Sequence, residues 1–400
     1  MDSLDKATIL LINLPPGALC GVGLLSFTTS PRFCGVKLLP KGIHFIYTGA
    51  TTSLSVRSGV WIAPETSSTG QGETIIKVWD ADREELVEEK DEAEKLRWKA
   101  NVRGLWQENL TPYRQSVDGA AGEPDRTWTA LVDCITPSLL SRITGGQRND
   151  WTLSTSSAMR QDMEDIPGLT YGENSTIRQE KELNFLPIDL KQTWRDGAIG
   201  RERTEAAKDR SWALGDMVAR YCSQGEEKEV VGEMQFCFLM VLTLANFSCL
   251  SQWKRLLNLT LTCQKAVRER SDLYVRILRV LRLQLQRCND VEGGLFDLSD
   301  DEGGTLLAQL LRKFRRGLED EYGEQTSDVR DEYAILEAYV QREFGWELSD
   351  SFVRRGVLEL EDGEQVEMEL DELEGEDERG EYAPVVVYLG EDGRATTPPS

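Results

Sequence analysis

The spacing of hydrophobic residues changes twice along the chain. The N-terminal part contains short apolar runs, rich in β-branched and aromatic residues and separated by Gly and Pro, which is typical of strands. These runs cover residues 8–14, 35–39, 42–47, 58–63 and 74–79. A densely charged stretch from Asp82 to Arg97 is expected to form a helix. The pattern therefore predicts a β-rich N-terminal domain over residues 1–145.

The next segment, residues 146–178, is rich in polar residues and Gly and has no apolar period, which predicts a linker. Over residues 179–355 the apolar positions recur at helical spacing. The run from Val230 to Leu250 is nearly all apolar, so we expect it to be the central buried helix. Several antiparallel helices joined by short loops form a bundle. The predicted fold class is α+β, a β-rich domain followed by an α-helical bundle.

The composition changes again in residues 356–400. Between Gly356 and Asp392 there are fifteen acidic residues and one basic residue, Arg379. Such a segment has too little apolar surface to fold alone, so we expect a flexible acidic tail. Its valine-rich part, residues 382–389, predicts a strand. This strand could add to the edge of a partner's sheet through backbone hydrogen bonds, or it could close a sheet edge of its own chain.

Composition excludes several classes of function. The chain carries a net charge of −23, and a surface of this sign repels phosphate, so we expect no direct nucleic-acid partner. Its eight cysteines include no Cys-x-x-Cys pair, and with one histidine they cannot form a zinc site of the usual spacing. We expect buried free thiols and no cofactor. The longest apolar run, about fifteen residues, is shorter than the ~20 of a membrane span, so no membrane association is expected.

The motifs of common enzymes are missing as well. His44 lies in a strand-like run, so a structural role is expected for it. The sequence has no Gly-x-Ser-x-Gly nucleophile motif and no Gly-x-x-x-x-Gly-Lys-[Ser/Thr] phosphate loop. Paired carboxylates are too abundant in an acidic chain to identify a site. We therefore predict no catalytic residues and no enzymatic activity.

Basic residues concentrate on the predicted helices, seven of them between Gln264 and Asn289 and four more at Arg312, Lys313, Arg315 and Arg316. One interpretation is a solvated helix face whose apolar side is packed. The other is a docking surface for an acidic partner, which includes the chain's own tail. RNA contact would need exposed aromatic residues for stacking, and these are not interleaved here. The candidate docking residues are Arg276, Arg279 and Arg282.

Three groups of segments resemble the AAR-type cistron-splicing factor family. They are residues 11–17 with 31–45, residues 232–239 leading into 252–258, and residues 383–387. The resemblance implies a β-rich domain followed by a helical domain similar to VHS domains, without catalytic activity. The acidic run 359–381 is longer than the family pattern.

The resemblance also implies a function and a partner. Members of this family are assembly factors of the U5 small nuclear ribonucleoprotein. They bind the RNase H-like and JAB/MPN-type domains of its large central scaffold protein, which delays the joining of the RNA helicase. A location in cytoplasm and nucleus is expected, and the oligomeric state is left open. The strand-adding residues would be Pro384, Val385, Val386, Val387 and Tyr388. The alternative function is a VHS-like trafficking adaptor that binds short acidic peptides.

Overall fold

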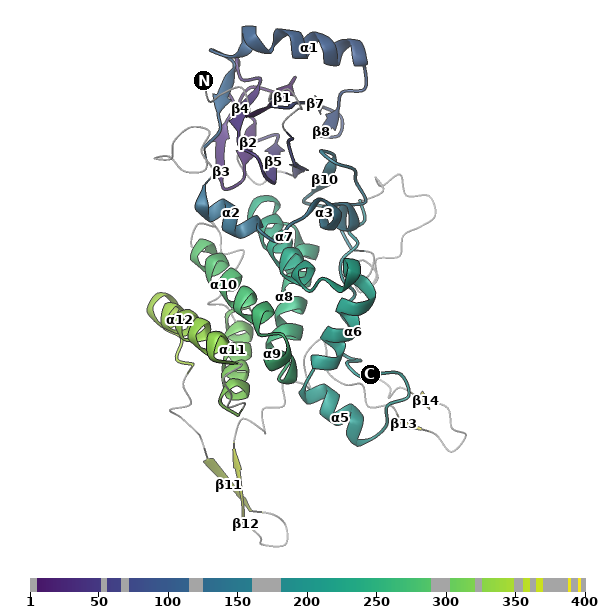
Figure 1. Ribbon diagram of the computed structural model, residues 1–400, viewed down its shortest axis with the longest axis vertical. Helices are drawn as coiled ribbons and strands as arrows, with labels where there is room; N and C mark the ends of the chain where they lie inside the picture. Colours follow the sequence, from purple (N-terminus) through teal and green to yellow (C-terminus); the bar gives the residue numbers. More distant parts are fainter. Residues whose placement is uncertain are drawn as a thin grey trace.

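The computed structural model describes residues 6–51, 56–65, 72–114, 125–159, 181–288, 303–320 and 326–348, and four short strands beyond residue 354. Strands come first along the chain and helices follow, so the predicted α+β class is confirmed. Strands β1 to β10 lie at one end of the molecule and the helical bundle lies at the other (Figure 1). Between them lie α2 (Arg126–Val132) and α3 (Pro137–Thr144).

The N-terminal half contains two five-stranded sheets. The first has the order β8-β7-β1-β4-β9, and β1 runs parallel to β7. The second has the order β10-β6-β5-β2-β3 and is antiparallel. The strands of the first sheet are β1 (Ala7–Ile12), β4 (Gly35–Leu39), β7 (Thr74–Asp80), β8 (Glu85–Glu88) and β9 (Leu110–Pro112). Those of the second are β2 (Leu19–Val22), β3 (Leu25–Thr28), β5 (His44–Gly49), β6 (Arg57–Ile62) and β10 (Trp151–Ser154).

Side chains alternate between the two faces of each strand, and three layers result. Ile9 of β1 shares a core with Val60 of β6, so the two sheets pack face to face. Leu10 points the other way, into a small cluster that includes partly buried residues of helix α1 (Glu92–Leu105). The outer face of the second sheet carries Trp61, which belongs to the core of the helical half. One continuous core therefore joins the second sheet to the helices.

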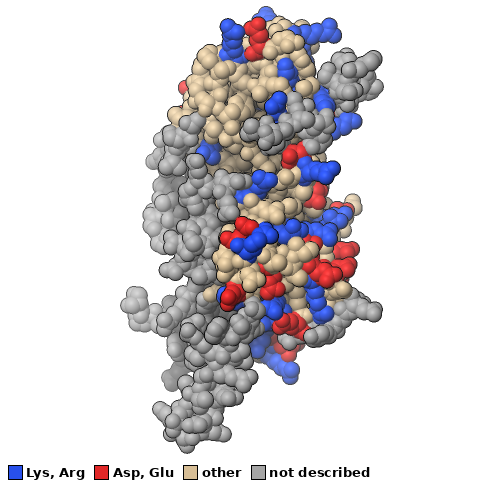
Figure 2. Space-filling model, turned by 90° about the vertical axis from the view of Figure 1, so that its left-hand side faces the viewer, with Lys and Arg blue, Asp and Glu red and all other residues tan. Residues whose placement is uncertain are grey.

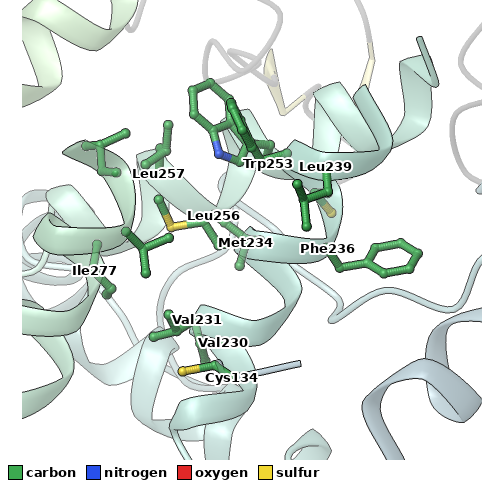
Figure 3. Packing of buried hydrophobic residues seen from close by; sticks show 14 of the residues in the cluster. Cys134, Val230, Val231, Met234, Phe236, Leu239, Trp253, Leu256, Leu257 and Ile277 are labelled. Atoms are coloured by element: carbon green, nitrogen blue, oxygen red, sulfur yellow. The ribbon is translucent and has the colours of Figure 1, made fainter. Parts of the chain in front are cut away.

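The helical half is built around α7 (Lys228–Leu244), in which fifteen of seventeen residues are buried. A helix that is apolar on every side needs neighbours on every side. Figure 3 shows Leu256 and Leu257 of α8 and Ile277 of α10 packed near Val231 and Met234 of α7. The other helices are α5 (Arg201–Lys208), α6 (Ser211–Tyr221), α8 (Phe247–Leu261), α9 (Lys265–Glu269), α10 (Ser271–Cys288), α11 (Gly303–Asp320) and α12 (Ser327–Phe344).

The predicted single helix from Val230 to Leu250 is wrong in its extent. Ala245 adopts the left-handed conformation, with φ 54° and ψ 39°, and ends α7. The side chain of Asn246 then accepts a hydrogen bond from the backbone N–H of Cys249 at 2.8 Å and caps α8. An asparagine favours an N-cap because its side chain satisfies a free N–H of the first turn. The apolar run is therefore two helices with a sharp turn between them.

Two further expectations near the first domain need correction. The linker predicted for residues 146–178 contains β10, which pairs with β6 at the edge of the second sheet. Residues 160–178 lie outside the described residues. The stretch from Asp82 to Arg97 begins as strand β8, and the helix starts only at Glu92. Both errors share a cause, because pairing with a neighbouring strand outweighed the local composition.

The tail contains two short pairs of strands. The antiparallel pair β11 (Arg355–Glu359) and β12 (Gln365–Glu369) lies below the helical bundle in Figure 1. A second pair consists of β13 (Tyr388–Leu389) and β14 (Ala395–Thr396). Much of the acidic run between them lies outside the described residues.

Substitution of Gly232 in α7 tests how closely the β-rich half and the helical half approach each other. A Cβ placed on Gly232 would lie 2.3 Å from the carbonyl oxygen of Cys134, in the turn between α2 and α3. We expect Gly232→Ala to lower the free energy of unfolding by about 1–3 kcal/mol, because backbone must move to admit the methyl group. Chemical denaturation of the full chain measures this.

The matched control is Gly215→Ala in α6. There the added Cβ would meet only the end of the Arg270 side chain, at 3.7 Å. Alanine favours the helix over glycine, so this variant should be as stable as the original chain or more stable by up to about 1 kcal/mol. Equal stability of the Gly232→Ala variant and the unchanged chain would contradict the close approach.

Candidate protein-interaction site

Aromatic side chains form the apolar part of the contact between the two halves. Phe236 of α7 stacks on Trp61 of β6, with ring centroids 5.9 Å apart. Trp61 also stacks on Trp128 of α2, with ring centroids 6.1 Å apart. The ring of Phe45, on the neighbouring strand β5, lies 4.8 Å from the ring of Trp61. Such pairs contribute about 0.5–1.5 kcal/mol beyond the burial of their area. The second sheet therefore packs against α7 through large aromatic rings.

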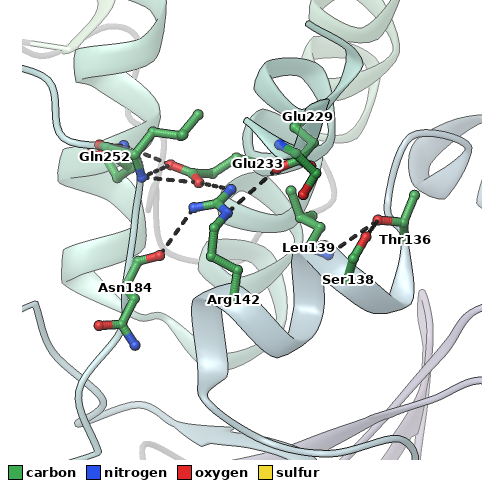
Figure 4. A network of polar contacts seen from close by, with 10 residues as sticks. Thr136, Ser138, Leu139, Arg142, Asn184, Glu229, Glu233 and Gln252 are labelled. Atoms are coloured by element: carbon green, nitrogen blue, oxygen red, sulfur yellow. Dashed lines mark hydrogen bonds and ion pairs between the residues drawn. The ribbon is translucent and has the colours of Figure 1, made fainter. Parts of the chain in front are cut away.

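An arginine of α3 enters the same contact (Figure 4). Nη2 of Arg142 lies 2.8 Å from Oε2 of Glu233, and its Nε lies 3.6 Å from Oε2 of Glu229. Nε2 of Gln252, in α8, donates to Oε1 of Glu233 at 2.8 Å. The backbone N–H of Leu186 donates to the same oxygen at 2.9 Å. The carboxylate of Glu233 thus receives donors from α3, α8 and the segment that precedes α5.

The environment of Glu233 explains why it needs these donors. Its side chain has no exposed surface. Burial raises the pKa of Glu233, whereas the charge and hydrogen bond of Arg142, the N–H of Leu186 and the amide of Gln252 lower it. An unpaired carboxylate at this depth would cost several kcal/mol. The three donors therefore stabilise Glu233 only while both halves keep their present positions.

A second set of polar contacts ties the end of α7 to the sheet. Nη1 of Arg57 donates to the carbonyl of Thr243 at 3.0 Å, and Oγ1 of Thr155 donates to that of Leu244 at 2.8 Å. Nδ2 of Asn246 donates in turn to the carbonyl of Thr155 at 3.3 Å. The last carbonyls of a helix have no partner within it. Here the sheet supplies the partners, so α7 is held at both ends.

Sequence reasoning missed these residues. Glu233 lies in an apolar run, and a fully buried glutamate is almost always paired, so the run itself contained an indication. Its partner Arg142 lies 91 positions earlier, in a different predicted domain. No local pattern connects two residues at that separation.

A double-mutant cycle on Arg142 and Glu233 measures the coupling of the halves. We expect Glu233→Ala to lower the free energy of unfolding by about 3–5 kcal/mol, because Arg142 and the amide of Gln252 lose a buried acceptor. The coupling energy between Arg142→Ala and Glu233→Ala should exceed about 1.5 kcal/mol.

The control cycle uses Arg32 and Glu108, which also pair within hydrogen-bonding distance but have side chains 76% and 72% exposed. Their coupling should stay below about 1 kcal/mol, because water screens an exposed pair. Similar coupling in the two cycles would show that the buried pair does not hold the halves together.

The candidate docking residues of α10 have unequal surroundings. Nε of Arg279 lies 2.7 Å and Nη2 of Arg282 2.9 Å from the carboxylate of Glu332 in α12. Burial acts to raise the pKa of Glu332, but the hydrogen bonds and charges of Arg279 and Arg282 hold it below its ordinary value. The side chain of Arg276 is exposed and makes no hydrogen bond or ion pair with another described residue. Two of the three arginines therefore hold α12 in place, and their docking role stays a prediction.

The predicted strand of the tail is described only at one end. Pro384, Val385, Val386 and Val387 lie outside the described residues. Tyr388 begins β13 and pairs with Thr396 of β14 within the same chain. The strand-adding role of these five residues stays a prediction.

His44 has the surroundings of a structural residue, as expected from its strand. It is 2% exposed, its Nε2 lies 2.8 Å from the carbonyl oxygen of Pro40, and its ring meets that of Tyr113 edge to face at 5.1 Å. Burial lowers the pKa of His44 to about 4, although the hydrogen bond to Pro40 acts in the opposite direction. These surroundings are those of an imidazole that packs in the β-rich half and holds the chain at Pro40.

The lowered pKa of His44 has a consequence for acid stability. The unfolded chain takes up this proton near pH 6.5 and the folded chain near pH 4, so stability falls as the pH drops through that range. The loss from His44 is on the order of 3 kcal/mol. We expect His44→Gln to lose less stability than the unchanged chain between pH 6.5 and pH 4, measured by denaturation at each pH. Parallel pH curves for the two proteins would contradict this burial, and loss of cellular function in a stable variant would contradict the structural role.

The described residues offer little for chemistry of other kinds. All eight cysteines are free thiols and six of them are buried, so that expectation is confirmed. Across the described ranges, no three His, Cys, Asp or Glu side chains are grouped to hold a metal ion. None of the helices in this part of the chain has the length and apolar composition that crossing a bilayer requires. The clusters described above are contacts between the sheet and the helices of this chain.

Comparison with known proteins identifies relatives of both halves. The family model described as AAR2 N-terminal domain matches residues 5–145, and the model described as AAR2 C-terminal repeat region matches residues 185–349. The Protein AAR2 homolog of Mus musculus is 26% identical over 301 residues, which cover 70% of this chain and 76% of the relative. That of Caenorhabditis elegans is 24% identical over 373 residues, which cover 86% of this chain and 95% of the relative. The N-terminal model matches the first part of the chain and the C-terminal model the second, and together they cover more than half of it. This chain therefore belongs to the AAR2 family.

Proposed function

We propose that this chain is a pre-mRNA splicing factor that acts in the assembly of the U5 small nuclear ribonucleoprotein. The observation that carries the proposal is family membership across both halves, since a splicing and assembly role is supported at the level of the AAR2 family. The relative from Caenorhabditis elegans aligns over nearly its whole length, so the likeness is not limited to one domain.

The partner is the large central scaffold protein of the U5 particle. The chain binds the RNase H-like and JAB/MPN-type domains of that protein and delays the joining of the RNA helicase. The protein works in the cytoplasm and the nucleus. The continuous core between sheet and helices favours this role, because a single rigid body can keep two partner domains at a set separation.

The tail supplies the adaptable part of the contact. Residues 384–388 add a strand to a sheet edge of the scaffold, where backbone hydrogen bonds give affinity. Alternate residues of a strand share a face, so Val385 and Val387 enter the same side of the partner. The acidic run before them separates this strand from the helical bundle.

The proposed role requires no catalysis, and the AAR2 family is not a known family of enzymes. The trafficking-adaptor alternative depends on the arginines of α10 as a binding site for acidic peptides. Arg279 and Arg282 pair with Glu332 of the same chain. Nothing about these contacts points to a sorting peptide as a ligand, so that alternative has no specific observation in its favour.

Binding to the scaffold tests the proposal directly. The full-length chain, immobilised through an N-terminal tag, should retain a scaffold fragment that carries both the RNase H-like and JAB/MPN-type domains. Isothermal titration should then give a dissociation constant below about 1 µM, which corresponds to roughly 8 kcal/mol. Absence of binding at that concentration would contradict the proposed function.

A single substitution separates strand addition from other modes of binding. Val386→Pro removes a backbone N–H and places a ring in the ladder, which costs about 3 kcal/mol or more, equal to a weakening of roughly hundredfold. Val386→Thr is the matched control, because threonine keeps the N–H and the β-branched shape. Equal affinity of the proline and threonine variants would show that this residue does not pair with a sheet.

A further inference from the structure

A basic face crosses two elements of the helical half, α7 and α10. It consists of Arg276, Arg279 and Arg282 of α10 and Lys228, the first residue of α7. The side chains of Lys228 and Arg276 are exposed and make no hydrogen bond or ion pair with another described residue. Figure 2, which views the molecule from the side of α10 and α12, shows Lys and Arg gathered over the helical half with Asp and Glu among them. The face carries four positive charges, and Glu332 neutralises one.

Lys228 and Arg276 act on a common neighbour. Burial and the charge of Asp133 raise the pKa of Cys134 to about 11, and both cations act on the thiol in the opposite direction. Cys134 packs beside Val230 and Val231, the third and fourth residues of α7 (Figure 3), and α10 contacts both α2 and α7. Lys228, at the start of α7, and α10 therefore both lie near the turn that carries Cys134. Arg279 lies one helical turn beyond Arg276 on the same side of α10.

Two of the arginines are already fixed in place. Glu332 holds Arg279 and Arg282 through Nε and Nη2, and the side chain of Arg279 remains 60% exposed. A guanidinium has five N–H donors, so each arginine keeps donors for a second carboxylate. Because their side chains are held by Glu332, less conformational freedom is lost when an acidic ligand binds.

The chain contains an acidic segment with matching charge. Residues 371–381 include seven acidic residues and one arginine, Arg379, and lie outside the described residues. Residues 1–355 and 393–400 together carry a much lower density of negative charge. Residues 359–369 are as acidic as this segment, but Glu359, Glu367 and Glu369 belong to the paired strands β11 and β12. Outside that hairpin, charge complementarity favours residues 371–381 as the ligand of the basic face.

The segment is long enough to reach the face. Glu332 and Leu348 are sixteen positions apart, mostly in α12, which spans about 30 Å at most. From Leu348 the chain runs seven residues to Arg355, which pairs with Glu369 across β11 and β12. Because Glu369 lies beside Arg355 in the hairpin, the chain leaves the hairpin close to where it entered. Glu376 can therefore lie up to about 50 Å from Leu348.

We propose that residues 371–381 dock on the basic face of the same chain. The contact forms in the free protein and does not depend on the proposed splicing role. It gathers the acidic run against the helical bundle, so that a partner for the following valine-rich segment must compete with this contact or bind beside it.

Proteolysis of the full-length chain tests this docking. Arg379 is the trypsin site inside the segment, and Arg394 lies beyond it. We compare initial cleavage rates at the two sites by mass spectrometry in the unchanged chain and in Lys228→Glu/Arg276→Glu. That variant breaks no ion pair of the described structure. Cleavage after Arg379 should become at least about fivefold faster relative to Arg394, and ~0.5 M NaCl should abolish the difference, because salt screens exposed charges.

The matched control is Lys99→Glu/Arg103→Glu on α1, which makes the same change of net charge at the far end of the molecule (Figure 1). These side chains also make no hydrogen bond or ion pair with another described residue, and the control should cleave like the unchanged chain. Equal rates in all three proteins would overturn the proposal, and so would equal acceleration in both variants.

Zero-length carboxyl–amine cross-linking provides an independent measurement. In the unchanged chain Lys228 should couple to acidic residues within 371–381, and Arg276→Glu should reduce the yield. Coupling of Lys228 mainly to the acidic residues of the segment 289–302 would identify a different ligand and overturn the proposal. A failure of scaffold binding would leave both readouts unchanged, so the two proposals fail separately.

Discussion

Arg142 of α3 and Glu233 of α7 lie 2.8 Å apart at the junction of the two halves, where the carboxylate has no exposed surface. A charge at that depth is stable only when its donors stay in position, and these donors come from the β-rich half, from α8 and from the segment before α5. The stacked rings of Trp61 and Phe236 and the bonds from Arg57 to the end of α7 depend on the same placement. The arrangement of sheet and bundle follows from this requirement.

This constraint defines the rigid part of the molecule, and a segment of different composition follows it in the sequence. Sheets and helices share one core, so they are expected to meet a partner as a single surface. Beyond Gly356 the sequence turns strongly acidic and then contains the valine-rich segment 382–389. An assembly factor benefits from both features. In the role that we propose, the rigid body would set the geometry of the complex, and the valine-rich strand would add affinity without a large preformed interface.

Much of the fold could be predicted from the sequence, and the limits of prediction have physical causes. Periods of two and of 3.6 residues separate the strands from the helices, because burial on one face imposes those periods. The break at Ala245 was missed, since alanine is a helix former and only the tertiary contacts of Asn246 select the turn. Strand β10 was missed because its polar surroundings resemble a linker, and its partner β6 lies about ninety residues away.

The candidate site was harder to predict than the fold. Sequence patterns identified Arg276, Arg279 and Arg282 as basic, but they could not show that Glu332 engages two of them. The sequence patterns also gave no partner for Glu233, because an ion pair between residues of different domains produces no regular spacing in the local sequence. Residues that act through long-range contacts became visible only when the two halves were seen together.

Native-state hydrogen exchange of the full-length chain, followed by mass spectrometry, tests the shared core most directly. If α7 joins both halves, the slowest amides of β6 and of α7 open with the same free energy and the same response to denaturant, as one cooperative unit. Exchange of β6 through a separate opening of lower free energy, while α7 stays protected, would contradict the account.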